Sequence, residues 1–303
     1  MDYPNEYGFA TESRAMTALR RLGSDKLAWS LRRLHCPVPD DALVLEVGSG
    51  GNPYPRANVL LDAYEDTRER HWVPLVVDRP FILGYVENLP FKSDSFDFLI
   101  ASHVLEHSRD PEQTLSEFQR VAKAGYIEVP DAFMERFNPY KDHRLELTVR
   151  DDQLLIRKKS NWIVDTDLVE LYEDRAKPVV TRELMPKRPF NFMVRYYWRR
   201  PINYRILNPE VDISWPPPAS PAIHPPNNAL TRTRDGIIKT LRSVGSQRAR
   251  NQRLDIFPLL SCPTCRSEAD LVRTGDTVVC PTCQTSYAVR SGIPILYPQQ
   301  AAA

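Results

Sequence analysis

The sequence lacks a charge excess of either sign. Its 303 residues carry 40 Lys and Arg against 39 Asp and Glu, which leaves a formal net charge of +1. A chain-wide basic field that would grip nucleic acid or an anionic membrane is therefore not expected. No apolar run approaches the roughly 18 residues that a membrane helix needs. The N-terminus has neither a basic start nor an apolar core, so it does not resemble a secretory signal, and we predict a cytoplasmic protein without membrane contact.

Glycine is scarce, with 11 residues, and cysteine scarcer still, with five, whereas proline is abundant, with 27. Seven prolines fall within residues 209–226, where they exclude helix and central strand and favour an extended linker. A hydrophobic content of 42% is enough for a sizeable core, and the length suggests two folded units. We place these units at residues 1–207 and 259–298, with the proline-rich linker and a basic helical segment between them at 208–258.

Short apolar runs predict buried strands in the larger unit. The runs Ala42–Val47, Asn58–Asp62 and Phe96–Ser102 are typical of strands covered on both faces of a parallel sheet, and Tyr126–Val129 fits less strongly. An antiparallel hairpin is expected to turn at Asp151–Asp152.

A helix is predicted just before the fourth strand. Asp110 is a suitable N-cap, Pro111 fits the first turn, Gln113 completes a capping box, and Gly125 fits just past the end. Strand, helix, strand is the order of an open α/β sheet. The predicted fold is therefore a Rossmann-like α/β sheet with helices on both faces.

A glycine-rich turn follows the first predicted strand. Gly48 and Gly50 allow positive φ and a close approach of the backbone to a ligand, and ligands of open α/β sheets bind beyond the carboxyl ends of strands. Asp62 ends the next strand, where a carboxylate can accept hydrogen bonds from ribose hydroxyls. Taken alone, the glycine loop has an ordinary tight turn as its alternative, and Asp62 has a solvated loop acid. The loop and the acid together favour a nucleoside site.

The order of these pieces resembles the class I S-adenosylmethionine-dependent methyltransferases of the small-molecule type. The matching pieces, over residues 40–160, are LEVGSG, the acid Asp62, ENLPF, SFDFLIASHVLEH, and a helix ending in RV before YIEVP. The resemblance implies that the glycine loop holds the methionine end of S-adenosylmethionine, that Asp62 holds the ribose, and that the stretch before LPF flanks the adenine. The cofactor residues so implied are Glu46, Gly48, Ser49, Gly50, Asp62, Tyr85, Glu87, Asn88, Leu89 and Ser102.

Two departures from that family pattern bear on the cofactor. The segment NPYPRA replaces the helix that is usual between the glycine loop and the second strand. Tyr85 stands where the family commonly has an acid that pairs with the adenine amino group, although an aromatic ring could stack on adenine instead. A non-catalytic binding or scaffold protein with this fold is the alternative that these departures leave open.

Two histidines are the candidates for catalysis. Methyl transfer from a sulfonium needs in-line positioning, and a general base helps when the acceptor is a hydroxyl. The resemblance places His103 near the transferred methyl group, and His143 is the second candidate, with a satisfied loop histidine as its alternative. On a helical start, His103 and His107 would share one face. Glu106 and His107 are expected to order that helix start rather than to act in catalysis.

The pattern CPTC-x14-CPTC predicts a metal site in the C-terminal unit. Two cysteine knuckles can complete a tetrahedral Zn²⁺ site, and four thiolates leave no open coordination position, which indicates a structural zinc. A module of about 40 residues has too little core to fold without such a crosslink, whereas disulfides are the alternative. The predicted ligands are Cys262, Cys265, Cys280 and Cys283.

The tail after the cysteines resembles a small zinc-ribbon family whose best-known member activates tRNA, rRNA and protein methyltransferases. The matching residues are Tyr287, Val289, Gly292, Ile293 and Pro294. This resemblance implies that the ribbon packs on the methyltransferase domain.

These features predict a cytoplasmic S-adenosylmethionine-dependent methyltransferase that methylates an oxygen or nitrogen of a small molecule or glycan. The first alternative is an RNA or protein methyltransferase that uses the ribbon and the basic segment 231–253 for substrate contact. The balanced net charge disfavours nucleic acid. The second alternative is the non-catalytic scaffold.

Overall fold

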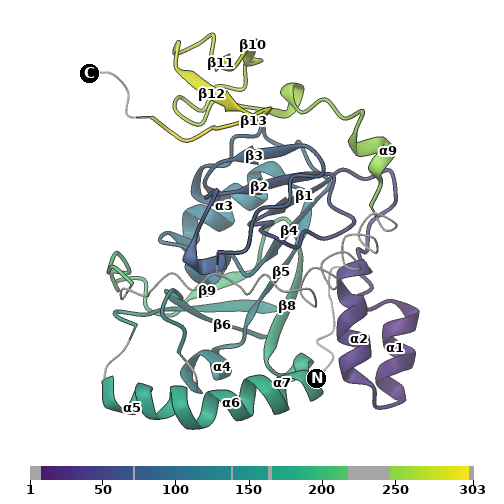
Figure 1. Cartoon of the computed structure of the whole chain (residues 1–303), viewed down its shortest axis with the longest axis vertical. Helices are drawn as coiled ribbons and strands as arrows, with labels where there is room; N and C mark the ends of the chain where they lie inside the picture. The colour runs from purple at the N-terminus through teal and green to yellow at the C-terminus, as the bar shows by residue number, and fades with distance from the viewer. Residues whose placement is uncertain (1–7, 71, 138, 163–165, 218–245, 300–303) are drawn as a thin grey trace. The chain divides into compact units, whose positions relative to one another are not determined.

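The computed structural model divides into two units of interleaved chain segments (Figure 1). The described residues are 8–70, 72–137, 139–162, 166–217 and 246–299. Unit 1 comprises Met1–Pro37, Ser102–Arg109 and Tyr126–Ser220, and unit 2 comprises Val38–Ala101, Asp110–Gly125 and Pro221–Ala303. Within the described residues, no helix has both the length and the apolar character that crossing a bilayer requires. The predicted domain boundaries near residues 207 and 258 stay predictions.

Parallel strands form the centre of unit 2. β1 (Val44–Val47) lies between β2 (Val59–Asp62) and β4 (Phe98–Ser102), and β3 (Phe81–Leu83) pairs with β2. Every residue of these strands is buried, as the unbroken apolar runs predicted. Their carboxyl ends therefore lie along one edge of the sheet. The predicted α/β fold with a parallel-dominated sheet is confirmed.

The helix α3 (Pro111–Val121) begins as its sequence predicts. The carboxylate of Asp110 accepts a hydrogen bond from the backbone N–H of Gln113 at 3.0 Å. Pro111 stands in the first turn, as predicted. The side-chain amide of Gln113 donates to the carbonyl of Glu87, and the predicted capping box stays a prediction. The predicted glycine just past the helix was wrong, because the helix ends at Val121 and Ala122 turns directly into extended backbone. Gly125 lies inside β5 (Ala124–Pro130), so the helix needs no glycine at its end.

The C-terminal part of unit 2 contains the short helix α9 (Arg248–Asn251) and a small antiparallel sheet, which joins the edge of the parallel sheet. The strands of the small sheet are β10 (Val272–Thr274), β11 (Thr277–Val279), β12 (Ser286–Arg290) and β13 (Ile293–Pro294). Beyond β13, the backbone N–H of Leu296 donates to the carbonyl of Leu83 at 2.8 Å, and Ile295 bridges Leu83 in parallel. The side chains of Ile293, Ile295 and Tyr297 pack against buried residues of β2 and β3.

Unit 1 contains helices and a second small sheet. Its elements are α1 (Arg14–Arg21), α2 (Asp25–Leu31), most of β5, α4 (Ala132–Phe137), β6 (Leu145–Arg150), β7 (Gln153–Lys158), α5 (Thr166–Leu171), α6 (Lys177–Val179), α7 (Met185–Lys187), β8 (Met193–Arg199) and β9 (Tyr204–Ile206). Two π-helical stretches, Tyr172–Ala176 and Val180–Leu184, join α5, α6 and α7 into one helical segment. The predicted hairpin is confirmed, since β6 and β7 turn at Asp151 and Asp152, both with positive φ.

The first half of the predicted linker is bound to this hairpin. The indole N–H of Trp215 donates to the carbonyl of Lys159 at 2.7 Å, and the guanidinium of Arg144 donates to the carbonyls of Ile213 and Trp215. The remaining linker residues, 218–226, and residues 231–245 of the predicted basic helical segment lie outside the described residues.

Candidate functional site

The glycine loop after β1 adopts a conformation that requires glycine. Gly48 and Gly50 have φ values of 62° and 56°, in the left-handed region. A Cβ atom on Gly51 would lie 2.4 Å from Cγ1 of Val73, so this position has no room for a side chain. The carboxylate of Glu46 accepts the backbone N–H of Tyr54 at 2.7 Å and thereby ties the NPYPRA segment back to β1.

Asp62 at the end of β2 contacts this loop directly. Its Oδ2 accepts the backbone N–H of Gly50 at 2.9 Å, and its Oδ1 accepts the backbone N–H of Tyr64 at 3.2 Å. Burial raises the pKa of Asp62, while the guanidinium of Arg70, 3.3 Å from Oδ1, opposes that rise. Arg70 was not identified from the sequence, because nothing in its own segment indicates that it folds back onto Asp62.

The loop and the acid fit the cofactor that the sequence implied. The Ser49 hydroxyl is buried and makes no hydrogen bond among the described residues, which is the state expected of a group kept for a ligand. The charged methionine end of S-adenosylmethionine would satisfy it. Ribose hydroxyls can donate to the Asp62 carboxylate in competition with Arg70.

Three tyrosines gather next to Asp62, beyond β2 and β3. The ring centroids of Tyr85 and Tyr297 are 4.7 Å apart, and those of Tyr64 and Tyr85 are 6.1 Å apart. The hydroxyl of Tyr297 donates to the carbonyl of Ala63 at 2.6 Å. Tyr297 was missed from the sequence because it follows the ribbon, more than 200 residues after Tyr85.

The neighbours of Tyr85 have structural partners. The backbone N–H of Leu89 donates to the carboxylate of Glu117 at 2.8 Å, and the Asn88 amide donates to the carbonyl of Pro263 in the ribbon at 2.7 Å. Glu87 accepts the Gln113 amide through its carbonyl. These bonds fix the backbone beside Tyr85, and a cofactor role for the three residues stays a prediction.

His103 follows β4 in an unusual backbone conformation. Its φ of 58° lies in the left-handed region, which is uncommon for a residue with a side chain and is enriched at functional sites. Its Nδ1 lies 3.2 Å from Oε1 of Glu106, its Nε2 lies 3.9 Å from Oε1 of Glu128, and its side chain is 46% exposed. Partial burial would lower the pKa of His103, but these carboxylates raise it. The shared helical face expected for His103 and His107 was wrong, since the helical turn begins only at Leu105.

Glu128 on β5 anchors this end of unit 1. It is fully buried, and it accepts two hydrogen bonds from the guanidinium of Arg32 at 2.8 and 3.1 Å and one from the Tyr126 hydroxyl at 2.6 Å. Burial alone would raise the pKa of Glu128, but Arg32 lowers it to about 2. The hydroxyl of Ser102 donates to the same carboxylate at 3.2 Å. Glu128 could not be identified from the sequence, because it stands alone among apolar residues of its strand.

The second predicted catalytic residue, His143, lies in a buried cluster. Its Nδ1 is 2.6 Å from Oε2 of Glu135, and its ring meets that of His107 edge to face at a centroid distance of 4.7 Å. The Nδ1 of His107 is 3.2 Å from the carbonyl oxygen of Asp142. Burial lowers the pKa of His107 to about 4, so its ring is neutral near pH 7. A direct role of His143 in catalysis stays a prediction.

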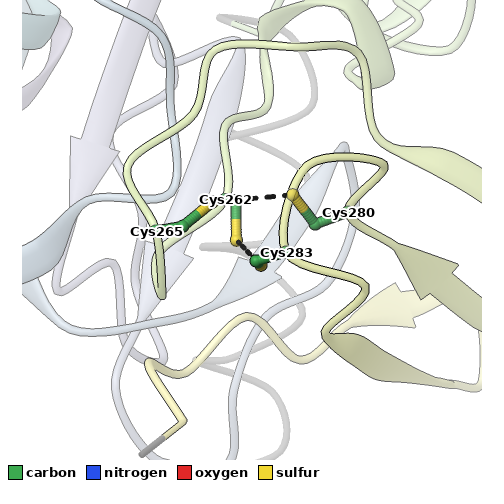
Figure 2. A group of neighbouring side chains, drawn as sticks. All are labelled: Cys262, Cys265, Cys280 and Cys283. Atoms are coloured by element: carbon green, nitrogen blue, oxygen red, sulfur yellow. Dashed lines mark hydrogen bonds between the residues drawn. The ribbon is translucent and has the colours of Figure 1, made fainter. Parts of the chain in front are cut away.

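The four predicted zinc ligands converge on one point in unit 2. Figure 2 shows their sulfur atoms turned toward one another. The Sγ atoms of Cys262 and Cys283 are 3.6 Å apart and those of Cys265 and Cys280 are 3.7 Å apart. A disulfide would need about 2.05 Å. A tetrahedron with Zn–S bonds of about 2.3 Å has edges of about 3.8 Å, so the thiols fit Zn²⁺.

The two cysteine knuckles are built in the same way. Arg266 and Gln284, each directly after the second cysteine of its pair, have φ values of 61° and 60°. Their backbone N–H groups donate to the carbonyls of Cys262 and Cys280, respectively, at 2.9 Å. This repetition explains how two CPTC segments 18 residues apart present four sulfurs to one point.

Comparisons with known proteins agree with this fold. Residues 57–127 match a family described as a methyltransferase domain. The parallel sheet and this match together agree with the Rossmann-like α/β fold predicted from the sequence. The matched segment includes Asp62, Tyr85 and His103, whereas the glycine loop lies just before it. No curated protein matches the chain in sequence.

Several solved structures are similar over part of the chain. A methyltransferase from Thermotoga maritima, titled a possible histamine N-methyltransferase, is 20% identical over 43% of this chain and 69% of its own, with a TM-score of 0.32. A chain from the Haloferax volcanii complex of the Trm112 methyltransferase activator with a methyltransferase is 17% identical over 45% and 74%, with a TM-score of 0.28. A methyltransferase from Mesorhizobium loti is 10% identical over 58% and 98%, with a TM-score of 0.33.

Proposed function

We propose that the chain is an S-adenosylmethionine-dependent methyltransferase that methylates an oxygen or nitrogen of a small molecule or glycan. The observation that carries this proposal is the hydrogen bond from the glycine loop to Asp62, at the carboxyl ends of two adjacent parallel strands. This is the position where open α/β sheets bind nucleosides. The match of residues 57–127 to a methyltransferase domain supports it.

The residues of unit 2 would hold the cofactor. When bound, S-adenosylmethionine supplies the methyl group as an electrophilic sulfonium. The Ser49 hydroxyl and the backbone of the glycine loop bind its methionine end, and the Asp62 carboxylate accepts hydrogen bonds from the ribose. Tyr85 and Tyr297 offer aromatic surface to the adenine, which replaces the acid that the family commonly has at position 85.

The residues after β4 would face the acceptor. His103 combines a half-exposed ring, a left-handed backbone and two carboxylates within 4 Å, so its orientation is fixed from both sides. We assign to it the role of positioning the acceptor and of accepting the proton that a hydroxyl or amine releases. Ser102 supports that arrangement through Glu128.

A cleft in unit 1 supports a small polar acceptor. It has a volume of about 470 Å³, within the range of small-molecule sites. Its lining combines charged side chains with the aromatic rings of Trp162 and Tyr172, and includes Glu135, Arg136, Arg157 and Lys159. Such a mixture of charge, hydrogen-bonding groups and an indole face suits a sugar or another polar small molecule better than an apolar one.

Zinc in the ribbon would be structural. Four thiolates saturate a tetrahedral ion, which then crosslinks the two knuckles and has no position left for substrate. The crosslink supports the tail that carries Tyr297 to Ala63 and Tyr85. The ribbon thereby contributes to the cofactor site at a distance from its own metal.

Calorimetric titration of the full chain with S-adenosylmethionine and S-adenosylhomocysteine tests the proposal. Replacement of Asp62 by Asn keeps its shape and removes its charge, so we expect affinity to fall by roughly 1.5–3 kcal/mol, which is about 10- to 150-fold. Asp270→Asn, at an exposed aspartate of the ribbon, is the matched control and should bind normally. No binding by the wild type at millimolar cofactor would favour the scaffold alternative instead.

A further inference from the structure

A buried carboxylate oxygen in unit 1 makes no hydrogen bond to the part of the chain that the structure describes. Glu106 is 1% exposed, and its Oε1 lies 3.2 Å from Nδ1 of His103. Its Oε2 is buried and makes no hydrogen bond among the residues that the structure describes. An unsatisfied buried carboxylate oxygen costs more than an ordinary lost hydrogen bond, because the charge has been removed from water. A native protein therefore needs a positively charged or donating group at this point.

Two imidazoles lie close to the Glu106 carboxylate, and each is held by a further group through its Nδ1 atom. The Nδ1 of His107 lies 3.2 Å from the carbonyl oxygen of Asp142, and the Nδ1 of His143 lies 2.6 Å from the carboxylate of Glu135. These contacts hold the two rings and engage only the Nδ1 atom of each. One ligand atom from each of Glu106, His107 and His143 lies within 4.8 Å of the others.

We propose that Glu106, His107 and His143 bind a divalent first-row transition-metal ion. Two imidazole nitrogens and one carboxylate oxygen suit zinc, iron or cobalt, whereas magnesium and calcium prefer all-oxygen sites. The Glu135 carboxylate and the Asp142 carbonyl are the outer partners that histidine ligands of metals usually have.

This site differs in kind from the cysteine site. Three protein ligands leave coordination positions for water or for a substrate oxygen, as in sites that act on a ligand. Its ligands come from one 3-10 turn (Leu105–His107) and from the loop before β6, both in unit 1. The competing arrangement is a direct hydrogen bond from one imidazole N–H to Oε2 of Glu106, which needs no ion.

Cobalt binding to the full chain distinguishes the two arrangements. Protein that holds zinc at the cysteines is titrated with Co²⁺, passed through gel filtration and analysed for both metals by mass spectrometry. We expect one zinc and one cobalt per chain, and visible absorption from cobalt without a thiolate charge-transfer band. A wild type that retains no cobalt, or that takes cobalt only with such a band, would overturn the proposal.

Three variants locate the ion. Glu106→Gln keeps the shape of the side chain, and we expect it to retain the zinc and to lose the cobalt. Glu135→Gln, which changes only an outer partner, should weaken cobalt binding about 10- to 100-fold. His35→Ala, at a histidine bonded to the carbonyl of Ala10, is the control and should retain both metals.

His107→Gln provides a second test should Glu106→Gln fail to fold, as judged by its circular dichroism melting curve. Full cobalt retention in either folded variant would contradict the assignment. Since cobalt is counted without S-adenosylmethionine, this result and the test of the proposed function can fail independently.

Discussion

The ribbon and the cluster of Glu106, His107 and His143 bring metal-binding side chains together in two contrasting ways. In the ribbon, four sulfurs come from two knuckles with the same backbone geometry, and one of the four cysteines, Cys265, is exposed. In the cluster, the Glu106 carboxylate and the His143 imidazole are buried and the His107 imidazole is partly buried, and each side chain is held by an outer partner. A saturated sulfur site supplies a crosslink, whereas an unsaturated one with fixed ligands can act on a bound molecule.

The largest effect should follow from breaking the crosslink. Cys265→Ser is expected to release the zinc and unfold the ribbon, because such sites contribute on the order of 10–16 kcal/mol near neutral pH. Hydrogen exchange should then show lost protection at Ile295 and Leu296, and at Leu83 of β3, to which they are bonded. Cys36→Ser, outside the ribbon, is the control. Retained zinc and unchanged protection in Cys265→Ser would contradict the assignment of zinc to the four cysteines.

The next largest effect concerns the ion pair in unit 1. Arg32→Met leaves the fully buried carboxylate of Glu128 without its charged partner, which should cost about 3–5 kcal/mol of unfolding free energy in urea. Arg33→Met, at the next residue of the same turn, should change stability far less. Equal losses in both variants would show that the pair does not stabilise unit 1.

The same carboxylate predicts a pH dependence. Its pKa in the folded protein is about 2, below the ordinary value of 4.5, so the unfolded chain takes up its proton first as the pH falls. The stabilisation by Glu128 is therefore complete above about pH 4.5 and is lost as the pH falls toward 2. Denaturant titrations across this range should show a steeper loss in the wild type than in Glu128→Gln. Identical pH profiles would contradict the depressed pKa.

The smallest expected effect lies at the ribbon tail. Tyr297→Phe removes only the hydrogen bond to the Ala63 carbonyl, which contributes about 0.5–1.5 kcal/mol to holding the tail, so cofactor affinity should fall by at most about 2- to 12-fold. Tyr297→Ala also removes the ring beside Tyr85 and should bind more weakly still. Titration calorimetry with S-adenosylhomocysteine measures both variants. Wild-type affinity in Tyr297→Ala would show that the ribbon tail does not contribute to the cofactor site.

The sequence predicted those features that depend on local spacing. Cysteines three residues apart specify their knuckles, an unbroken apolar run specifies a buried strand, and Asp151–Asp152 specifies the hairpin turn. In each case, the residues that decide the structure stand within a few positions of one another.

The features that the sequence did not reveal depend on residues brought together by the fold. Glu128 meets Arg32 across 96 positions, and Tyr297 reaches Ala63 across 234. His143 was selected as a catalytic candidate, yet its relation to Glu106 and His107 becomes visible only when the loop before β6 folds onto the turn after β4. Arg70, which engages Asp62, stands in a segment with no recognisable pattern.

The most direct test of the account is hydrogen exchange of the full chain with and without S-adenosylhomocysteine. We predict that added ligand protects the glycine loop around Gly48–Gly51, the end of β2 at Asp62, and the segments that contain Tyr85 and Tyr297. Protection confined to other parts of the chain, or no change at saturating ligand, would contradict the assignment of this edge of the sheet as the cofactor site.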